Sequence, residues 1–145
     1  MSQPLNSTST ASTGLPITRK TRISRLLLIE SEPELRRTLR LLLNSQGYQV
    51  VTASTVTEAY RLLGHKSFAF VLFDWFLEGD TGLELCRLIR TINKKIPLFF
   101  YTTSDGEDGL KQGIEAEVEE YLVNHIEANP ILKVIFQHIE KNRHQ

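Results

Sequence analysis

The stretch LLLIESEP at residues 26–33 decides the fold, because an apolar run typical of a buried strand ends abruptly on the acidic residues Glu30 and Glu32. A second stretch, VLFDWFLEGDTG at residues 71–82, repeats this pattern with Asp74. Strands without a polar face belong to parallel sheets that are covered on both sides. We therefore expect the two strand ends, with Glu30 and Asp74, to meet in space.

Five apolar runs alternate with longer amphipathic segments from residue 25 onward. The runs cover residues 25–29, 48–52, 68–73, 98–101 and 120–123. This alternation predicts an α/β fold with a parallel sheet between two helical layers. A (βα)5 chain of this length matches the doubly wound, flavodoxin-like strand order 2-1-3-4-5, whose binding crevice opens between the first and third strands. Thr102 and Asn124 are expected at the ends of the fourth and fifth strands, lining the same crevice.

Helix starts are marked by side chains that can accept hydrogen bonds from the first backbone amides. Capping boxes, a hydroxyl followed three residues later by Glu, begin at Ser31, Thr55, Thr81 and Ser104. Asn129 before Pro130 predicts a fifth start. The last helix is expected to carry Ile131, Ile135 and His138 or Ile139 on one face.

Composition, and the segments before and after the predicted domain, limit the class of protein to which the chain can belong. The chain has 145 residues, zero formal net charge and one cysteine, Cys86, so nothing favours nucleic acid as a partner and no intrachain disulfide can form. No apolar run approaches the ~20 residues of a membrane span, so we expect a cytoplasmic protein without membrane contact. Residues 1–24 are predicted to be a disordered Ser/Thr-rich tail, 25–141 one domain without room for an effector domain after it, and 142–145 a C-terminal tail.

The predicted crevice favours phosphoryl transfer. The turn after the first strand contains no glycine, which disfavours a flavin or dinucleotide because their phosphates need close approach to backbone amides. Carboxylates without nearby His or Cys suit a hard cation such as Mg²⁺. A carboxylate can also act as a nucleophile toward phosphorus and form an aspartyl phosphate.

Residues 25–139 resemble the receiver domain of two-component response regulators. The motif FDWFLEGDTGLEL carries Asp74 and Gly82, Ile96 and Pro97 lead to Thr102, and EEYLV at residues 119–123 carries Tyr121. The resemblance implies that Asp74 is the phosphoacceptor, Thr102 the switch hydroxyl and Tyr121 the switch aromatic. It also implies that Mg²⁺ is held by Glu30, Asp74 and the backbone carbonyl of Phe76.

Three positions depart from the family pattern. The second acidic residue after the first strand, which usually binds Mg²⁺ directly, is Ser31, and a helix cap is the simpler explanation of its hydroxyl. The usual Lys is Asn124, and a Pro common after the phosphoacceptor is Glu78. Removing charge from the metal site and from the phosphoryl oxygens predicts weak Mg²⁺ binding and compromised phosphorylation.

The favoured function is an atypical stand-alone receiver in a phosphorelay, without enzymatic activity beyond self-phosphorylation and autodephosphorylation on Asp74. Its implied partners are a sensor histidine kinase or phosphotransfer protein and a downstream protein. Signalling would change the face formed by the fourth helix, fifth strand and fifth helix, the family's usual homodimer surface. The alternative is a pseudo-receiver that works as a protein-interaction module without phosphate. A flavodoxin-like enzyme remains a distant third interpretation.

Overall fold

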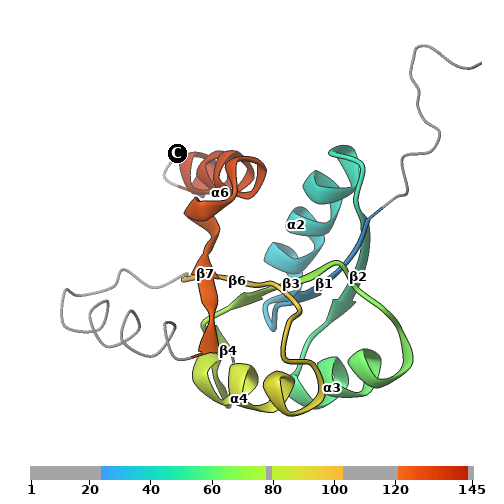
Figure 1. Ribbon diagram of the computed structural model, residues 1–145. Coiled ribbons are helices and arrows are strands. Elements are labelled where there is room, and N and C mark those ends of the chain that lie inside the picture. The colour runs from blue at the N-terminus through green and yellow to red at the C-terminus, as the bar shows by residue number, and fades with distance from the viewer. Residues whose placement is uncertain (1–23, 78–79, 103–120, 144–145) are drawn as a thin grey trace, which may run out of the picture.

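A five-stranded parallel sheet lies at the centre of the molecule (Figure 1). The computed structural model describes residues 24–77, 80–102 and 121–143. The strands are β1 (Arg25–Ile29), β2 (Gln49–Ala53), β3 (Phe70–Asp74), β6 (Leu98–Tyr101) and β7 (Val123–His125). Their spatial order is β2-β1-β3-β6-β7, all parallel, which confirms the predicted 2-1-3-4-5 arrangement. Residues 1–23 and 144–145 of the predicted tails lie outside the described residues, as do Glu78 and Ser104, whereas residues 142–143 belong to the last helix and not to a tail.

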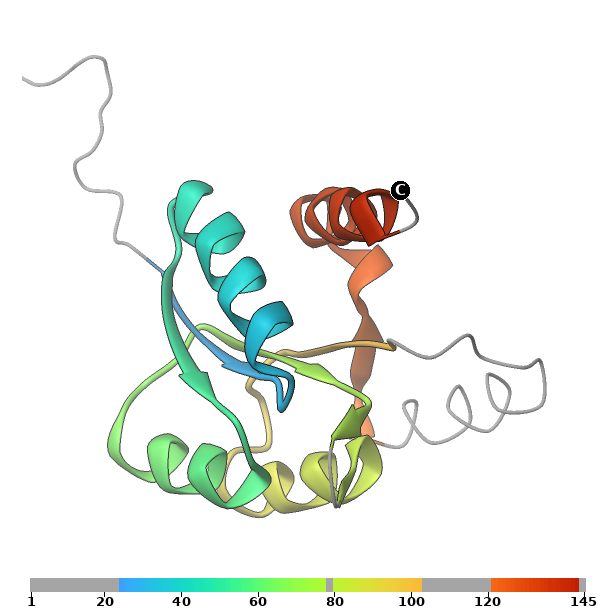
Figure 2. The same ribbon diagram turned by 180° about the vertical axis from the view of Figure 1, so that it is seen from behind.

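Helices form a layer on each side of the sheet, as the view from behind also shows (Figure 2). On one side lie α2 (Pro33–Ser45) and α6 (Pro130–Arg143), and on the other α3 (Val56–His65) and α4 (Gly82–Ile92). A short hairpin, β4 (Phe76–Leu77) with β5 (Asp80–Thr81), leads into α4, and the 3-10 helix η2 (Ile126–Ala128) precedes α6. The two layers explain why the strands lack a polar face.

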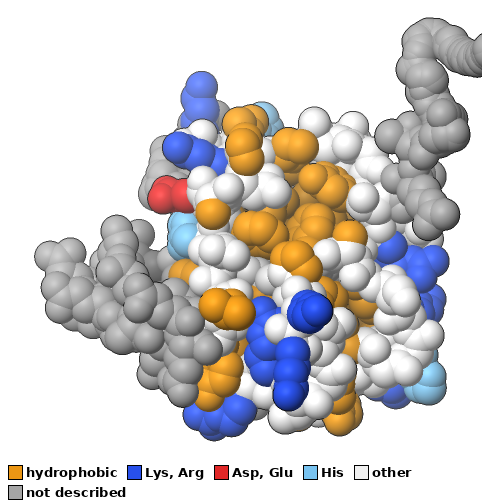
Figure 3. Space-filling view, viewed as in Figure 1, with side chains coloured by type: hydrophobic (Ala, Val, Ile, Leu, Met, Phe, Trp, Pro, Cys, Tyr) orange, Lys and Arg blue, Asp and Glu red, His pale blue; other side chains and the backbone are white. Residues whose placement is uncertain are grey.

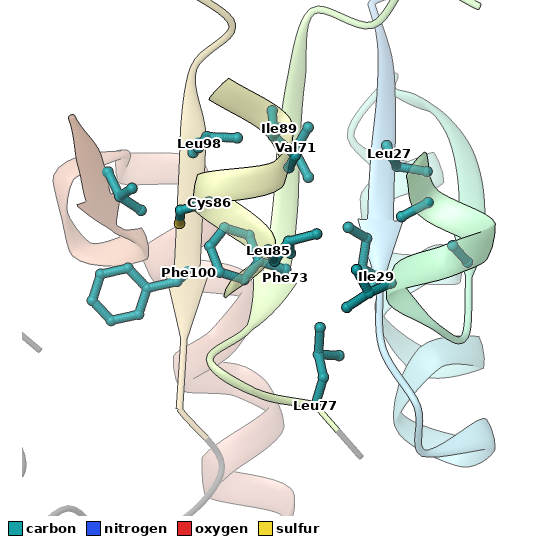
Figure 4. Packing of buried hydrophobic residues seen from close by; sticks show 14 of the residues in the cluster. Leu27, Ile29, Val71, Phe73, Leu77, Leu85, Cys86, Ile89, Leu98 and Phe100 are labelled. Carbon is teal, nitrogen blue, oxygen red and sulfur yellow. The ribbon is translucent and has the colours of Figure 1, made fainter. Parts of the chain in front are cut away.

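Successive strand residues supply the two layers of the core in turn. Leu27 and Ile29 pack with α3 and α4, whereas Leu26 and Leu28 pack with α2 and α6. Figure 4 shows the first of these clusters, in which Leu85, Cys86 and Ile89 of α4 face the sheet. Cys86 is fully buried among apolar side chains.

The first helix begins one residue later than predicted. Glu32, not Ser31, is the N-cap: its carboxylate accepts from the amides of Glu34 at 3.1 Å and Leu35 at 2.7 Å. Pro33 takes the first helical position, which suits its fixed φ and missing amide, so the residue before it becomes the cap. The predicted role of Ser31 as a cap is therefore wrong.

Two other predicted helix starts are confirmed. Thr55 Oγ1 accepts from the Glu58 amide at 3.1 Å, although the Glu58 carboxylate returns to the amide of Ser54 rather than to Thr55. Asn129 Oδ1 accepts from the amides of Ile131 and Leu132, both at 3.0 Å. Thr81 immediately precedes α4, but its side chain is not among those described.

The chain after residue 120 differs most from the sequence prediction. β7 begins at Val123, three residues later than expected, because Leu122 has a φ of +56°. This left-handed residue turns the chain into the strand. On α6 the buried face is Leu132, Ile135 and Phe136, whereas Ile131 is 41% exposed and His138 is exposed. Of the predicted face, Ile135 was assigned correctly, Ile131 and His138 were not, and the side chain of Ile139 lies outside those described.

Trp75, the residue after β3, packs against Gly82, the first residue of α4. The Gly82 amide donates to the Trp75 carbonyl at 2.6 Å, and the Trp75 indole lies directly over the glycine. A Cβ at Gly82 would overlap the indole ring. Trp75 is only 4% exposed and packs on Phe100 with ring centroids 5.0 Å apart. The absence of a side chain at Gly82 therefore lets α4 begin directly against the Trp75 indole.

We expect Gly82→Ala to lower the free energy of unfolding by about 1–3 kcal/mol, because the indole and the helix must move apart to admit a methyl group. Urea denaturation followed by circular dichroism measures this loss. Gly64→Ala is the matched control: nothing lies within 4 Å of a Cβ there, and alanine favours the helix, so stability should hold or rise slightly. Equal stability of Gly82→Ala and the wild type would contradict the packing.

Candidate functional site

Two buried carboxylates lie at the carboxyl edge of the sheet, on neighbouring central strands. Glu30 directly follows β1 and Asp74 is the last residue of β3, with exposed fractions of 1% and 3%. Ile29 pairs with Phe73 in the parallel register, so Glu30 and Asp74 follow at the same level. The structure therefore brings together the two strand ends that the apolar runs predicted would meet.

Each oxygen of the Glu30 carboxylate accepts a hydrogen bond. The Tyr101 hydroxyl donates to Oε1 at 2.6 Å, and the Glu32 amide donates to Oε2 at 2.9 Å. Arg36 Nη1 donates to the Glu30 carbonyl at 2.8 Å and pins the turn between β1 and α2. The buried carboxylate is thus held by the turn on one side and by a side chain of β6 on the other.

Asp74 is fixed by the chain that follows it. Its Oδ1 accepts from the Phe76 amide at 3.0 Å, and the next amide, of Trp75, donates to the Tyr101 carbonyl at 2.8 Å. These bonds hold the backbone of the β3–β4 turn against both the Asp74 carboxylate and the end of β6. Phe76, the residue whose carbonyl was predicted to bind Mg²⁺, is therefore positioned by Asp74 itself.

Tyr101 belongs to this site and was missed by the sequence reasoning. It pairs with Asp74 in the register of β3 and β6, and its phenol reaches over β3 to Glu30. Burial raises the pKa of Tyr101 well above its usual value, and the charge of Glu30, their hydrogen bond and the charge of Asp74 raise it further. The phenol consequently stays protonated and donates to Glu30.

The other predicted residues lie near this edge without a described contact to the acidic pair. Thr102 follows β6 directly and is half-buried, and Ser31 is half-buried in the turn before α2. Asn124 does not end its strand as predicted: it pairs with Phe99, which itself pairs with Leu72, two residues before Asp74. The late start of β7 accounts for this displacement.

Tyr121 lies on the opposite side of the sheet from Tyr101. It is half-buried against the cluster that packs with α3 and α4, and its carbonyl accepts from Arg90 Nε at 2.9 Å. Arg90 also donates to the Ile96 carbonyl at 2.8 Å, which ties α4 to the segments before β6 and β7. Tyr121 is therefore in the turn that precedes β7, not at a strand centre as predicted.

The two carboxylates are the type of ligand that a hard cation such as Mg²⁺ prefers. Mg²⁺ takes one or two carboxylates and keeps several waters, and Glu30 and Asp74 supply the carboxylates here. Within the described ranges no three His, Cys, Asp or Glu side chains group to hold a metal by themselves. Any cation at this edge would therefore complete its coordination with water, a backbone carbonyl or phosphate oxygens.

A positively charged pocket of about 220 Å³ lies on the α2 side of the same turn. Its lining residues are Pro33, Arg36, Arg37, Arg40 and Thr52. Arg36 joins this pocket to the acidic pair, because the same guanidinium that lines it holds the Glu30 carbonyl. A cationic surface thus borders the buried carboxylates.

The model of the response regulator receiver domain family matches residues 26–136. The chain belongs to this family. Receiver domains serve two-component signalling, and the flavodoxin-like fold described above is their fold. The sequence resemblance drawn from Asp74, Thr102 and Tyr121 is thereby confirmed at the level of the family.

Individual relatives show how far the likeness extends. The phosphate regulon transcriptional regulatory protein PhoB of Pseudomonas aeruginosa is 26% identical over 99 residues, covering 67% of this chain and 43% of the relative. The transcriptional regulatory protein ResD of Bacillus subtilis is 30% identical over 104 residues, covering 72% and 43%. This receiver therefore spans less than half the length of these two relatives.

Solved structures support the fold. The chemotaxis response regulator CheY4 of Vibrio cholerae matches with a TM-score of 0.65 at 17% identity, covering 83% of this chain and 98% of that one. The response regulator TrrA of Thermotoga maritima, solved in complex with Mg²⁺ and BeF, matches with a TM-score of 0.51 at 26% identity, covering 65% and 98%. Among the described helices, none is long and apolar enough to cross a membrane.

We expect the stability of this receiver to fall as pH rises above about 10. The native pKa of Tyr101 exceeds its usual 10.0, so its contribution is complete below that pH and is lost as the phenol ionises. Urea denaturation on both sides of this pH should show a smaller pH dependence in Tyr101→Phe than in the wild type. Tyr60→Phe, which removes a phenol from the surface, is the control, and equal pH dependence in all three proteins would exclude the effect.

Proposed function

We propose that this receiver accepts a phosphoryl group on Asp74 and that Mg²⁺ assists the transfer. The observation that carries this proposal is the pairing of buried Asp74 and Glu30 at one level of the sheet, on adjacent strands. An oxygen of Asp74 attacks the phosphorus, the bond from phosphorus to the donor breaks, and the donor leaves with the electron pair. The Mg²⁺ and BeF complex of TrrA supports this assignment by family likeness.

Glu30, Asp74 and the Phe76 carbonyl are the proposed ligands, with Ser31 at most a neutral one. Bound there, Mg²⁺ would neutralise charge on the phosphoryl oxygens. Glu30 carries the negative charge that Ser31 lacks, and its extra methylene lets it act from the end of β1. Ser31 is not needed as the cap of α2, because Glu32 caps that helix.

Transfer is expected to be slow. Deleting one preorganised donor to developing charge typically costs ~3 kcal/mol of transition-state stabilisation. Asn124 stands where the family has its Lys, carries no charge, and lies two residues before Asp74 along the strands. Thr102 remains available as the proposed switch hydroxyl, directly after β6.

The proposed donor is a sensor histidine kinase or a phosphotransfer protein, and the proposed output is a downstream protein or a second copy of the chain. The cationic pocket beside Glu30 suits an acidic or phosphorylated donor, because three guanidinium groups line it.

Apolar side chains gather over α6 and toward α2 in Figure 3, and Val134 on α6 is 64% exposed. These exposed groups support an output surface that includes α6. Part of the family's dimer surface lies outside the described residues, and independent action without an effector domain stays a prediction.

A phosphate-independent interaction module is the second candidate. The hydrogen bonds to both oxygens of Glu30 favour it, because the buried carboxylate is satisfied without a cation. The position of Asn124 favours it as well. The two candidates differ in one measurable property, covalent phosphate on Asp74.

We expect incubation with acetyl phosphate and Mg²⁺ to add the mass of one phosphoryl group to a fraction of the protein, read by intact mass spectrometry. Asp74→Asn should abolish the increment because the amide is not a nucleophile toward phosphorus. Glu34→Gln, which neutralises an exposed carboxylate on α2, should retain it. A folded wild type without any increment would contradict phosphorylation and leave the interaction module as the better assignment.

We expect Ser31→Asp to increase the phosphorylated fraction and to tighten Mg²⁺ binding, because it adds a full charge next to Glu30. Stability should change little, since Ser31 does not cap α2. Combination with Asn124→Lys should be non-additive, because both charges act on the same phosphoryl group. Ser24→Asp adds the same charge at the opposite end of β1, and an equal gain in that variant would show that net charge alone is responsible.

A further inference from the structure

Tyr101 contacts both the acidic site and α6. Its side chain is fully buried in the cluster between the sheet and the α2/α6 layer. The hydroxyl end contacts Glu30, and the ring packs on Phe136 of α6, with centroids 5.0 Å apart and planes inclined by 41°. One rigid side chain thus touches the acidic pair and a helix of the proposed output surface.

The Glu30 carboxylate depends on this contact for its position. A glutamate has one more rotatable bond than an aspartate, and an unsupported carboxylate at this edge could adopt several rotamers. The Tyr101 hydroxyl and the Glu32 amide restrain one oxygen each. Hydrogen-bond partners of this kind orient metal-binding side chains, and their loss typically weakens metal binding about 10–100-fold.

The contact of the Tyr101 ring with α6 also allows little movement, because Phe136 is buried. Phe136 is 8% exposed and shares its face of the helix with Leu132 and Ile135, which are also buried. The interior of this layer is close-packed, so a shift of the Tyr101 ring must be accommodated by Phe136. A change in the position of Glu30 would reach α6 through these two rings.

We propose that Tyr101 is a positioning residue, which holds the Glu30 carboxylate in the acidic site through its hydroxyl and couples that site to α6 through Phe136. As regards the cation, this inference rests on the proposed function. The coupling itself rests only on the contacts of Tyr101. The route runs on the α2/α6 side of the sheet, whereas Tyr121 lies on the other side.

The first test measures Mg²⁺ binding through the fluorescence of Trp75, the neighbour of Asp74. Tyr101→Phe keeps the ring and its packing on Phe136 but deletes the hydroxyl, so the Kd for Mg²⁺ should rise about 10-fold or more. Tyr48→Phe is the matched control, because it removes a phenol from the same apolar cluster at the other end of the sheet. An unchanged Kd in Tyr101→Phe would overturn the positioning role.

The second test needs no metal. Glu30→Gln should shift the backbone amide NMR signals of α6 in the wild-type background, and the same substitution in Tyr101→Phe should shift them much less. Equal shifts in both backgrounds would overturn the coupling. If the wild type binds no Mg²⁺, the proposed cation is wrong, whereas the α6 shifts still decide whether Tyr101 links Glu30 to the helix.

Discussion

The buried carboxylate of Glu30 is the constraint around which the carboxyl edge of the sheet is built. A charge removed from water costs several kcal/mol unless hydrogen bonds replace its hydration. Glu30 is 1% exposed, and the replacements come from the Tyr101 hydroxyl and the Glu32 amide. The amide of the turn before α2 and the buried Tyr101 phenol meet that requirement, and Arg36 holds the same turn through the Glu30 carbonyl.

The departures from the family pattern reduce charge, whereas Glu30 and Asp74 stay at the ends of their strands. Asp74 keeps its place at the end of β3, with its carboxylate held by the Phe76 amide, so the proposed nucleophile is positioned. Ser31 and Asn124 remove one negative and one positive charge from the family's arrangement. The net charge at the edge is therefore similar, and weaker cation binding and weaker stabilisation of a phosphoryl group stay predictions.

The two faces of the sheet offer different connections between the acidic edge and the rest of the molecule. On the α3/α4 side, Arg90 binds the Tyr121 and Ile96 carbonyls and makes the turn before β7 dependent on α4. On the α2/α6 side, Tyr101 reaches from Glu30 to Phe136. The proposed coupling through Tyr101 would carry a local change at the acidic edge to the α2/α6 layer separately from the α3/α4 layer.

The sequence by itself determined the strand order and the two carboxylates at the strand ends, because alternating apolar runs and helix-length segments permit few arrangements. It also determined the caps at Thr55 and Asn129, which depend on neighbouring residues alone. The alternation of strand residues held a further signal: Leu26, Leu28 and Glu30 face one side, as do Phe99 and Tyr101. Only the tertiary structure decided the rest. Tyr101 and Glu30 are 71 residues apart and meet because β3 lies between their strands, and the start of β7 depends on a turn whose contacts come from α4. Such contacts between distant segments leave no local pattern in the chain.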